Sequence, residues 1–223
     1  MQKGFEALPQ YIKSTYYYYE GLLSLFQFNY LNAEKSLTLS LETWNNTQEN
    51  FIKNVYSYLI PLNILLGIYP PKALIEKYKL TEFSSLSIAC QGGSLGLYEW
   101  EMAKLEEKFL KVGIYLFMEK LRNLVLRNMV MKLVEENEGS HILKLQLLTE
   151  RYNHSLEEVK WKEFQASEDD KVDIIGIEWI LSGLIYKGYI KGYISNEKQI
   201  LVLSKKEPFP ALRSVIENNG QNI

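Results

Sequence analysis

The stretch that decides the fold is GLIYKGYIKGYISNEKQILVLSKKEPFP, from Gly183 to Pro210. An apolar helix ends at Tyr186-Lys187-Gly188, and two short alternating runs follow it, Tyr189–Ser195 and Gln199–Ser204. The polar residues Asn196-Glu197-Lys198 between the runs are typical of a tight turn that joins two antiparallel strands. The stretch therefore predicts a helix followed by a β-hairpin.

The order helix, strand, turn, strand is that of the second half of a winged helix, a small module that binds nucleic acid or other proteins. Val172–Lys187 would be its recognition helix. The inward face of that helix is predicted from its 3–4 spacing to carry Ile174, Ile177, Leu181, Leu184 and Ile185. This module is the main clue to function.

Only helical signals precede the module, from Ile12 to about Asp170. The predicted helices are Tyr11–Phe28, Ala33–Trp44, Glu49–Leu66, Lys72–Tyr78, Phe83–Gln91, Leu95–Lys111, Ile114–Glu135, Ile142–Tyr152 and Leu156–Phe164. In the first two, small and large residues follow tetratricopeptide spacing, in which the small ones let antiparallel helices approach closely. These positions are Tyr17, Gly21, Ala33, Leu37 and Ser40.

The expected fold is mostly α: stacked antiparallel helix pairs, resembling a tetratricopeptide solenoid, over residues 1–135, and a winged-helix part over 136–212. Residues 213–223 are expected to be a flexible tail, because the chain after Pro210 is polar.

Composition narrows the functional classes. The chain has 223 residues, 47% hydrophobic content and a formal net charge of −2, which excludes a globally basic nucleic-acid binder but not a local basic face. Its single cysteine excludes an internal disulfide framework. No apolar run reaches the roughly 18–20 residues of a membrane span, and the first residues do not resemble a signal peptide. These features predict a soluble intracellular protein without membrane contact.

Tyrosine is unusually frequent, with 16 copies, four of them at Tyr16–Tyr19. Four consecutive helical residues lie about 100° apart and cover most of the helix circumference. If neighbours pack on both sides of this helix, one of them is not in this chain, and an exposed apolar surface is expected here. The alternative is that one or two of the tyrosines simply point to solvent.

No catalytic, metal or cofactor site is predicted. His141 and His154 lack further ligands in register, so we expect ordinary histidines. Cys90 lies among apolar residues and is expected to be a buried, inert thiol. The segment Gln91–Gly96 lacks the Lys-Ser/Thr ending of a phosphate-binding loop, so it is interpreted as a turn, with Ser94 as the N-cap of the next helix.

The candidate nucleic-acid-binding residues are five lysines around the hairpin: Lys187, Lys191, Lys198, Lys205 and Lys206. Glu197 is the only acid among them. They could gather on one edge and contact phosphates without reading sequence, or they could simply solvate a small module. Because none is arginine, bidentate base recognition is not expected.

Four segments resemble the PCI-domain family, and within it the PCI domain-containing protein 2 family. They are YYYYEGLLSLFQFNYLNAEKSL (Tyr16–Leu37), YLIPLNILLGIYPPKALIEKYKL (Tyr58–Leu80), GIYLFMEKLRNLVLRNMVMKLV (Gly113–Val134) and IEWILSGLIYKGYIKGYISNEKQILVLSKKEPFP (Ile177–Pro210). The last is the most specific, and the resemblance extends from about Tyr16 to Leu212.

The resemblance implies a non-catalytic scaffold of the nuclear mRNA export complex, located at or near nuclear pores. It implies pairing with a GANP/Sac-type scaffold through the winged helices, binding of a small acidic Sem/Dss-type protein, and weak, sequence-independent RNA binding in the complex. The chain departs from the family in one respect: family members usually carry a longer N-terminal run of helical repeats, so this sequence is expected to be either a trimmed or a compact version. The alternatives are a PCI subunit of a signalosome or proteasome-lid-like complex, a winged-helix DNA-binding regulator and, more remotely, an enzyme.

Overall fold

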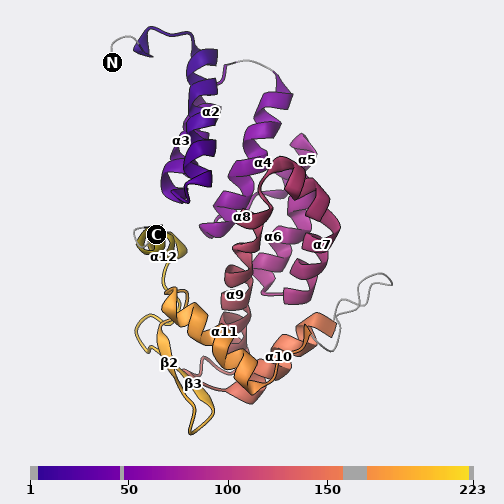
Figure 1. The fold of residues 1–223 in the computed structure, drawn as a ribbon, viewed down its shortest axis with the longest axis vertical. Coiled ribbons are helices and arrows are strands. Elements are labelled where there is room, and N and C mark those ends of the chain that lie inside the picture. The colour runs from indigo at the N-terminus through magenta and orange to yellow at the C-terminus, as the bar shows by residue number, and fades with distance from the viewer. Residues whose placement is uncertain (1–4, 46–47, 158–169, 221–223) are drawn as a thin grey trace. The chain divides into compact units, whose positions relative to one another are not determined.

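The computed structural model describes residues 5–45, 48–157 and 170–220 (Figure 1). The chain divides into two compact units, Met1–Phe83 with Ile216–Ile223 and Ser84–Val215, and each is described by itself. The predicted fold class is confirmed, because the chain is mainly helical and carries a three-stranded antiparallel sheet. The predicted boundary at residues 135 and 136 divides the chain by architecture, and it stays a prediction.

The first unit begins with two antiparallel helices, α2 (Gln10–Phe26) and α3 (Tyr30–Thr43). Asn29 is the N-cap of α3, because its side chain accepts a hydrogen bond from the backbone N–H of Asn32. With so short a connection, the second helix packs back along the first.

Small residues hold α2 and α3 close together, as the tetratricopeptide spacing predicts. A Cβ atom at Gly21 would lie only 2.7 Å from Leu37 Cγ. Two buried serines add a reciprocal pair of hydrogen bonds: Ser14 Oγ donates to the carbonyl of Ser40 (2.6 Å), and Ser40 Oγ donates to the carbonyl of Ser14 (2.8 Å). Larger side chains at these positions would push the helices apart.

The next helices begin and end within one residue of their predicted bounds. They are α4 (Glu49–Leu65), α5 (Lys72–Tyr78), α6 (Glu82–Gly92) and α7 (Leu95–Val112). Gly67 follows α4 with a φ of 85°, the left-handed conformation of a helix-terminating glycine.

The predicted helix Ile114–Glu135 is instead two helices, α8 (Tyr115–Glu119) and α9 (Leu121–Glu136). At their junction the backbone N–H of Lys120 bonds to the carbonyl of Phe117 (3.1 Å), three residues back rather than four. This tighter turn interrupts the α-helical ladder without changing the direction of the apolar pattern, so periodicity does not reveal it.

The winged helix is built from β1 (Ile142–Lys144), α10 (Leu145–Glu157), α11 (Ile174–Tyr186), β2 (Gly192–Ser195) and β3 (Ile200–Leu203). The strand order is β1-β3-β2, with both pairs antiparallel. Figure 1 draws α10 and α11 beside the hairpin of β2 and β3. The predicted recognition helix and hairpin are therefore confirmed.

The first strand was not predicted. The segment Ile142–Tyr152 was expected to be helical throughout, but it begins as β1, in which Leu143 pairs with Leu201 of β3. Three residues are too few to show a period of two, and the strand depends on a pairing partner far along the chain. Most of the predicted helix Leu156–Phe164 lies outside the described residues.

The C-terminal segment is also different from the prediction. Instead of a flexible tail, Leu212–Gly220 forms a helix, α12. Leu212, Val215 and Ile216 are at most 9% exposed. Their i, i+3, i+4 spacing is a helical apolar face, whose signal the overall polarity of the tail conceals.

Candidate interaction surfaces

Four of the five predicted lysines lie at one end of the hairpin. Lys187 is the C-cap residue of α11, Lys191 directly precedes β2, and Lys205 and Lys206 follow β3 after Ser204. The backbone N–H of Ser204 donates to the carbonyl of Lys191 (2.8 Å), so these segments lie side by side. We call Lys187, Lys191, Lys205 and Lys206, all exposed, the basic end.

Lys198 is not part of this group. It lies in the turn between β2 and β3, at the opposite end of the hairpin. A four-residue strand is roughly 13 Å long, so Lys198 is separated from the basic end by about the length of the hairpin. The structure therefore brings four of the candidate residues together and leaves the fifth apart.

An acidic side chain and a further lysine, Lys120, interact with residues of the basic end. Lys191 Nζ lies 2.5 Å from Glu207 Oε2, and both side chains are half-exposed, so this is a weak surface ion pair. Burial and the nearby charge of Lys187 lower the pKa of Lys120, at the junction of α8 and α9. Lys120 is far from Lys187 in sequence, and no sequence signal pointed to it.

The outward face of α11 is unexpectedly apolar. Ile177, Leu181 and Leu184 face inward as predicted and are at most 1% exposed. On the opposite side Trp179 is 77% exposed and Tyr186 is 91% exposed. The recognition helix thus presents aromatic rings, rather than cationic side chains, to solvent.

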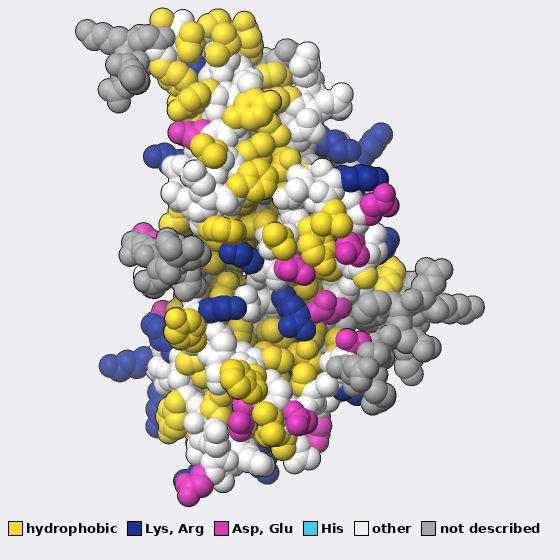
Figure 2. Space-filling view, in the orientation of Figure 1, with side chains coloured by type: hydrophobic (Ala, Val, Ile, Leu, Met, Phe, Trp, Pro, Cys, Tyr) yellow, Lys and Arg dark blue, Asp and Glu magenta, His cyan; other side chains and the backbone are white. Residues whose placement is uncertain are grey.

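A second exposed aromatic surface lies on α2. Tyr11, Tyr16, Tyr19 and Leu23 are all more than half exposed and line a shallow groove. Hydrophobic side chains gather over this part of the face drawn in Figure 2. Tyr18 points the other way, with its ring next to the rings of Phe51 and Tyr58.

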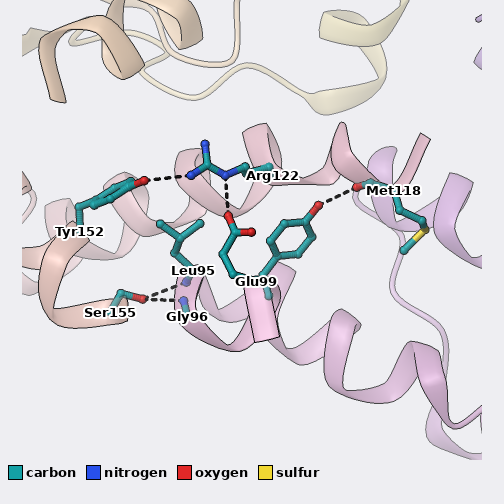
Figure 3. Close-up of polar contacts among 8 residues, drawn as sticks. Leu95, Gly96, Glu99, Met118, Arg122, Tyr152 and Ser155 are labelled. Atoms are coloured by element: carbon teal, nitrogen blue, oxygen red, sulfur yellow. Dashed lines mark hydrogen bonds and ion pairs between the residues drawn. The ribbon is translucent and has the colours of Figure 1, made fainter. Parts of the chain in front are cut away.

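Polar contacts attach the winged helix to the helices that precede it (Figure 3). Arg122 on α9 donates from Nε to Glu99 Oε1 on α7 (2.6 Å) and from Nη2 to the hydroxyl of Tyr152 on α10 (2.9 Å). Burial lowers the pKa of Arg122, but its hydrogen bonds to the Glu99 carboxylate and to the Tyr152 hydroxyl, together with the charge of Glu99, raise that pKa overall. Arg122 therefore bridges three helices.

The start of α7 is capped from a distance. Ser94 occupies the predicted N-cap position but makes no side-chain capping bond. Instead, the hydroxyl oxygen of Ser155 on α10 accepts hydrogen bonds from the backbone N–H groups of Leu95 (2.9 Å) and Gly96 (3.5 Å) (Figure 3). The two N–H groups have no partner within the helix, so Ser155 provides the N-terminal capping bonds that were predicted for Ser94.

A second arginine ties α9 to the segment behind the hairpin. Arg127, only 8% exposed, donates from Nη2 to the carbonyls of Phe209 (3.4 Å) and Pro210 (3.1 Å). Its guanidinium also lies 5.5 Å from the centre of the Phe209 ring. Next to it, Asn128 Nδ2 donates to the carbonyl of Cys90 (2.7 Å).

The turn between α6 and α7 lets the backbone of α9 pack closely against it. Gly93 has a φ of 65°, and a Cβ atom there would lie 2.4 Å from the backbone nitrogen of Met129. The backbone of α9 thus passes directly over the turn. This supports the prediction that Gln91–Gly96 is a turn between helices rather than a phosphate-binding loop.

Within the described ranges, no group of three or more His, Cys, Asp or Glu residues is arranged to hold a metal ion. Cys90 is fully buried, as predicted, and burial raises its pKa to about 12, so its thiolate is scarcely populated at neutral pH. In the part of the chain that the structure describes, no helix combines the length and apolarity needed to cross a membrane.

Comparison with known proteins gives a consistent result, although no family model matches the chain. It is 35% identical over 202 residues to PCI domain-containing protein 2 of Danio rerio, and 32% identical over 213 residues to Enhanced ethylene response protein 5 of Arabidopsis thaliana. It is 31% identical over 222 residues to Protein CSN12 homolog of Mycosarcoma maydis. These matches cover 90%, 93% and 94% of this chain, and 47%, 48% and 46% of the relatives. The chain thus spans about half the length of the curated relatives it matches.

Proposed function

From its homology to PCI domain-containing protein 2 over about nine-tenths of its length, and from the helical and winged-helix architecture described above, we propose that this chain is a non-catalytic scaffold subunit of a nuclear mRNA export complex. The observation that carries the proposal is this homology, which recurs in vertebrates, Dictyostelium and Drosophila at 31–35% identity.

The proposed partners are a GANP/Sac-type scaffold and a small acidic Sem/Dss-type protein, at or near nuclear pores. The anchoring of the winged helix supports a scaffold role. Arg122 and Arg127 tie it to α7, to α9 and to the segment after the hairpin through bonds to Glu99, Tyr152 and Pro210. A module held in this way presents its outer surfaces in a fixed geometry to a partner.

RNA binding is the second part of the proposal. The basic end supplies lysines without arginines, a composition suited to phosphate contacts rather than to base-pair readout. The aromatic outward face of α11 disfavours a duplex-DNA regulator, because a helix that enters the major groove reads base edges mainly through polar and cationic side chains.

Affinity purification tests the scaffold role. The tagged chain is captured from a nuclear extract of its source organism, and co-purifying proteins are identified by mass spectrometry. Recovery of a GANP/Sac-type scaffold together with a small acidic protein supports mRNA export. Recovery of signalosome or proteasome-lid subunits instead would assign the same fold to protein turnover and overturn the export proposal.

A pair of matched variants tests whether partner recovery depends on the anchoring of the winged helix. Arg122→Met breaks the contacts to Glu99 and Tyr152, whereas Lys111→Met breaks only an exposed pair with Glu107. The scaffold role predicts that Arg122→Met weakens partner recovery and that Lys111→Met does not. Equal recovery with both variants would mean that the anchoring of the winged helix is irrelevant to assembly.

A further inference from the structure

The outward face of α11 carries a regular row of exposed side chains. Ile175, Trp179, Ser182 and Tyr186 are spaced by three or four residues, so they lie within about 60° of one another around the helix. Ile175 is 63% exposed, Trp179 is 77% exposed and Tyr186 is 91% exposed. Large apolar side chains in this arrangement are unusual on a solvent face and indicate a ligand surface.

The row is interrupted rather than continuous. On this face of the helix, the residues between the two aromatic side chains are the small Ser182 and Gly183, and a Cβ atom at Gly183 would meet nothing within 4 Å. Trp179 and Tyr186 are seven positions apart, which corresponds to about 10 Å along the axis and is roughly the length of two to three nucleotides. The two rings are therefore separated by an open part of the helix surface at Ser182 and Gly183, which we call the shelf.

Charge distinguishes the two ends of the shelf. Tyr186 is followed directly by Lys187, the first residue of the basic end, and Lys191 lies just beyond the helix. At the other end Glu178 adjoins Trp179 and Asp173 caps the helix. A polyanion would be attracted to the Tyr186 end, while the charged residues nearest to Trp179 in sequence are acidic.

We propose that this face of α11 is a stacking surface for single-stranded RNA, with bases on Trp179 and Tyr186 and phosphates on the basic end. The inference rests on the RNA-binding part of the proposed function and adds the class of RNA and the residues that hold its bases. Single-strand binders commonly combine aromatic rings with a cationic groove, because every base has a π-face and every nucleotide a phosphate. A protein helix would instead favour a continuous apolar stripe, which Ser182 and Gly183 interrupt.

The test uses the full chain and a fluorescein-labelled 15-nucleotide oligoadenylate, with binding followed by anisotropy and by quenching of tryptophan fluorescence. Trp179→Ala and Tyr186→Ala are each expected to weaken binding roughly 5- to 100-fold, and Trp179→Phe to retain most of it. Duplex RNA of the same length is expected to bind more weakly, since its bases are already stacked. Thermal unfolding confirms that the variants, all at exposed positions, remain folded.

Tyr193→Ala is the matched control. Tyr193 is 62% exposed, but it pairs with Val202 on the face of the sheet opposite to buried Leu201 and Leu203. We expect its removal to leave affinity unchanged. An equal loss with Tyr193→Ala would show that any exposed aromatic residue serves and would overturn a site on α11.

Two other outcomes separate this inference from the function on which it rests. Unchanged affinity in Trp179→Ala and Tyr186→Ala, with loss in a Lys205→Glu/Lys206→Glu variant, would overturn the stacking surface and leave RNA binding intact. If Trp179→Ala or Tyr186→Ala loses a protein partner in the affinity purification while its affinity for oligoadenylate is unchanged, α11 is a protein-docking helix and the stacking surface is overturned. If the unaltered chain does not bind the oligoadenylate, both RNA proposals fail while the scaffold role remains separately tested.

Discussion

Arg127 on α9 donates a hydrogen bond of 3.1 Å to the carbonyl of Pro210, 83 residues further along the chain. The contact holds the segment after the hairpin against α9. A buried guanidinium is costly to desolvate, so its position depends on the carbonyls of Phe209 and Pro210 and on the side chain of Asn128.

Replacing Arg127 with methionine is expected to lower the free energy of unfolding by about 2–4 kcal/mol, because the buried carbonyl of Pro210 and the partly buried carbonyl of Phe209 lose a charged donor. Urea unfolding followed by circular dichroism measures this loss. Arg151→Met is the control, since Arg151 forms only a partly exposed pair with Glu136, and less than about 1 kcal/mol is expected. Equal losses in the two variants would mean that the Pro210 contact adds nothing.

Alanine variants at Gly93 and Gly139 distinguish the cost of crowding α9 from the cost of backbone strain. Both have positive φ, 65° and 74°, but only at Gly93 would a Cβ atom meet backbone, whereas at Gly139 it would meet nothing within 4 Å. Gly139→Ala is expected to cost about 1 kcal/mol, from conformational strain alone. Gly93→Ala is expected to cost a further 1–3 kcal/mol, because the helix must move.

Denaturant unfolding of the two alanine variants provides the comparison. If Gly93→Ala is no less stable than Gly139→Ala, the turn can move away from α9 without cost. That result would mean that the glycine at position 93 is not required for the packing of α9 against the turn.

The success of sequence-based prediction here depended on how local each signal is. Helices such as α4 and α5 are bounded by Gly67 and Pro71 and were predicted to within a residue. The strand β1 and the cap supplied by Ser155 depend on partners far along the chain, so no local pattern reveals them. The separation of Lys198 from the other four lysines, in contrast, is a local feature, because Lys198 lies in the predicted turn at the far end of the hairpin.

The last two tyrosines of the run Tyr16–Tyr19, Tyr18 and Tyr19, should respond differently to truncation. Tyr18→Ala is expected to cost about 2–3 kcal/mol in unfolding free energy, because Tyr18 packs against Phe51 and Tyr58. Tyr19→Ala, at a position 63% exposed, should cost less than about 1 kcal/mol. It should also reduce the binding of an apolar fluorescent dye to the folded chain. If monodisperse protein binds no such dye, the exposed surface of α2 is not available.

Alkaline pH should destabilise the chain partly through Tyr189. Burial raises the pKa of Tyr189 from 10.0 to about 12, so the folded state holds its proton more tightly than the unfolded state does. The resulting stability is fully present below pH 10 and is lost as the pH rises from 10 to 12, by about 2 kcal/mol at pH 12. Tyr189→Phe should therefore lose less stability than the unaltered chain across this interval, as measured by urea unfolding at each pH. Parallel losses would mean that Tyr189 does not contribute.

Replacing Lys205 and Lys206 with glutamate should weaken RNA binding and flatten its salt dependence while leaving the fold intact. Each phosphate contact to a single strand adds about 0.7 to the slope of log affinity against log salt, so two lost contacts should reduce that slope by roughly 1.4. Lys198→Glu is the control, because Lys198 lies at the far end of the hairpin. Anisotropy titrations of the oligoadenylate at several salt concentrations give the three slopes. If the slope of the double variant is unchanged, Lys205 and Lys206 do not contact RNA. If Lys198→Glu lowers the slope as much per charge, the effect comes from net charge rather than from the basic end.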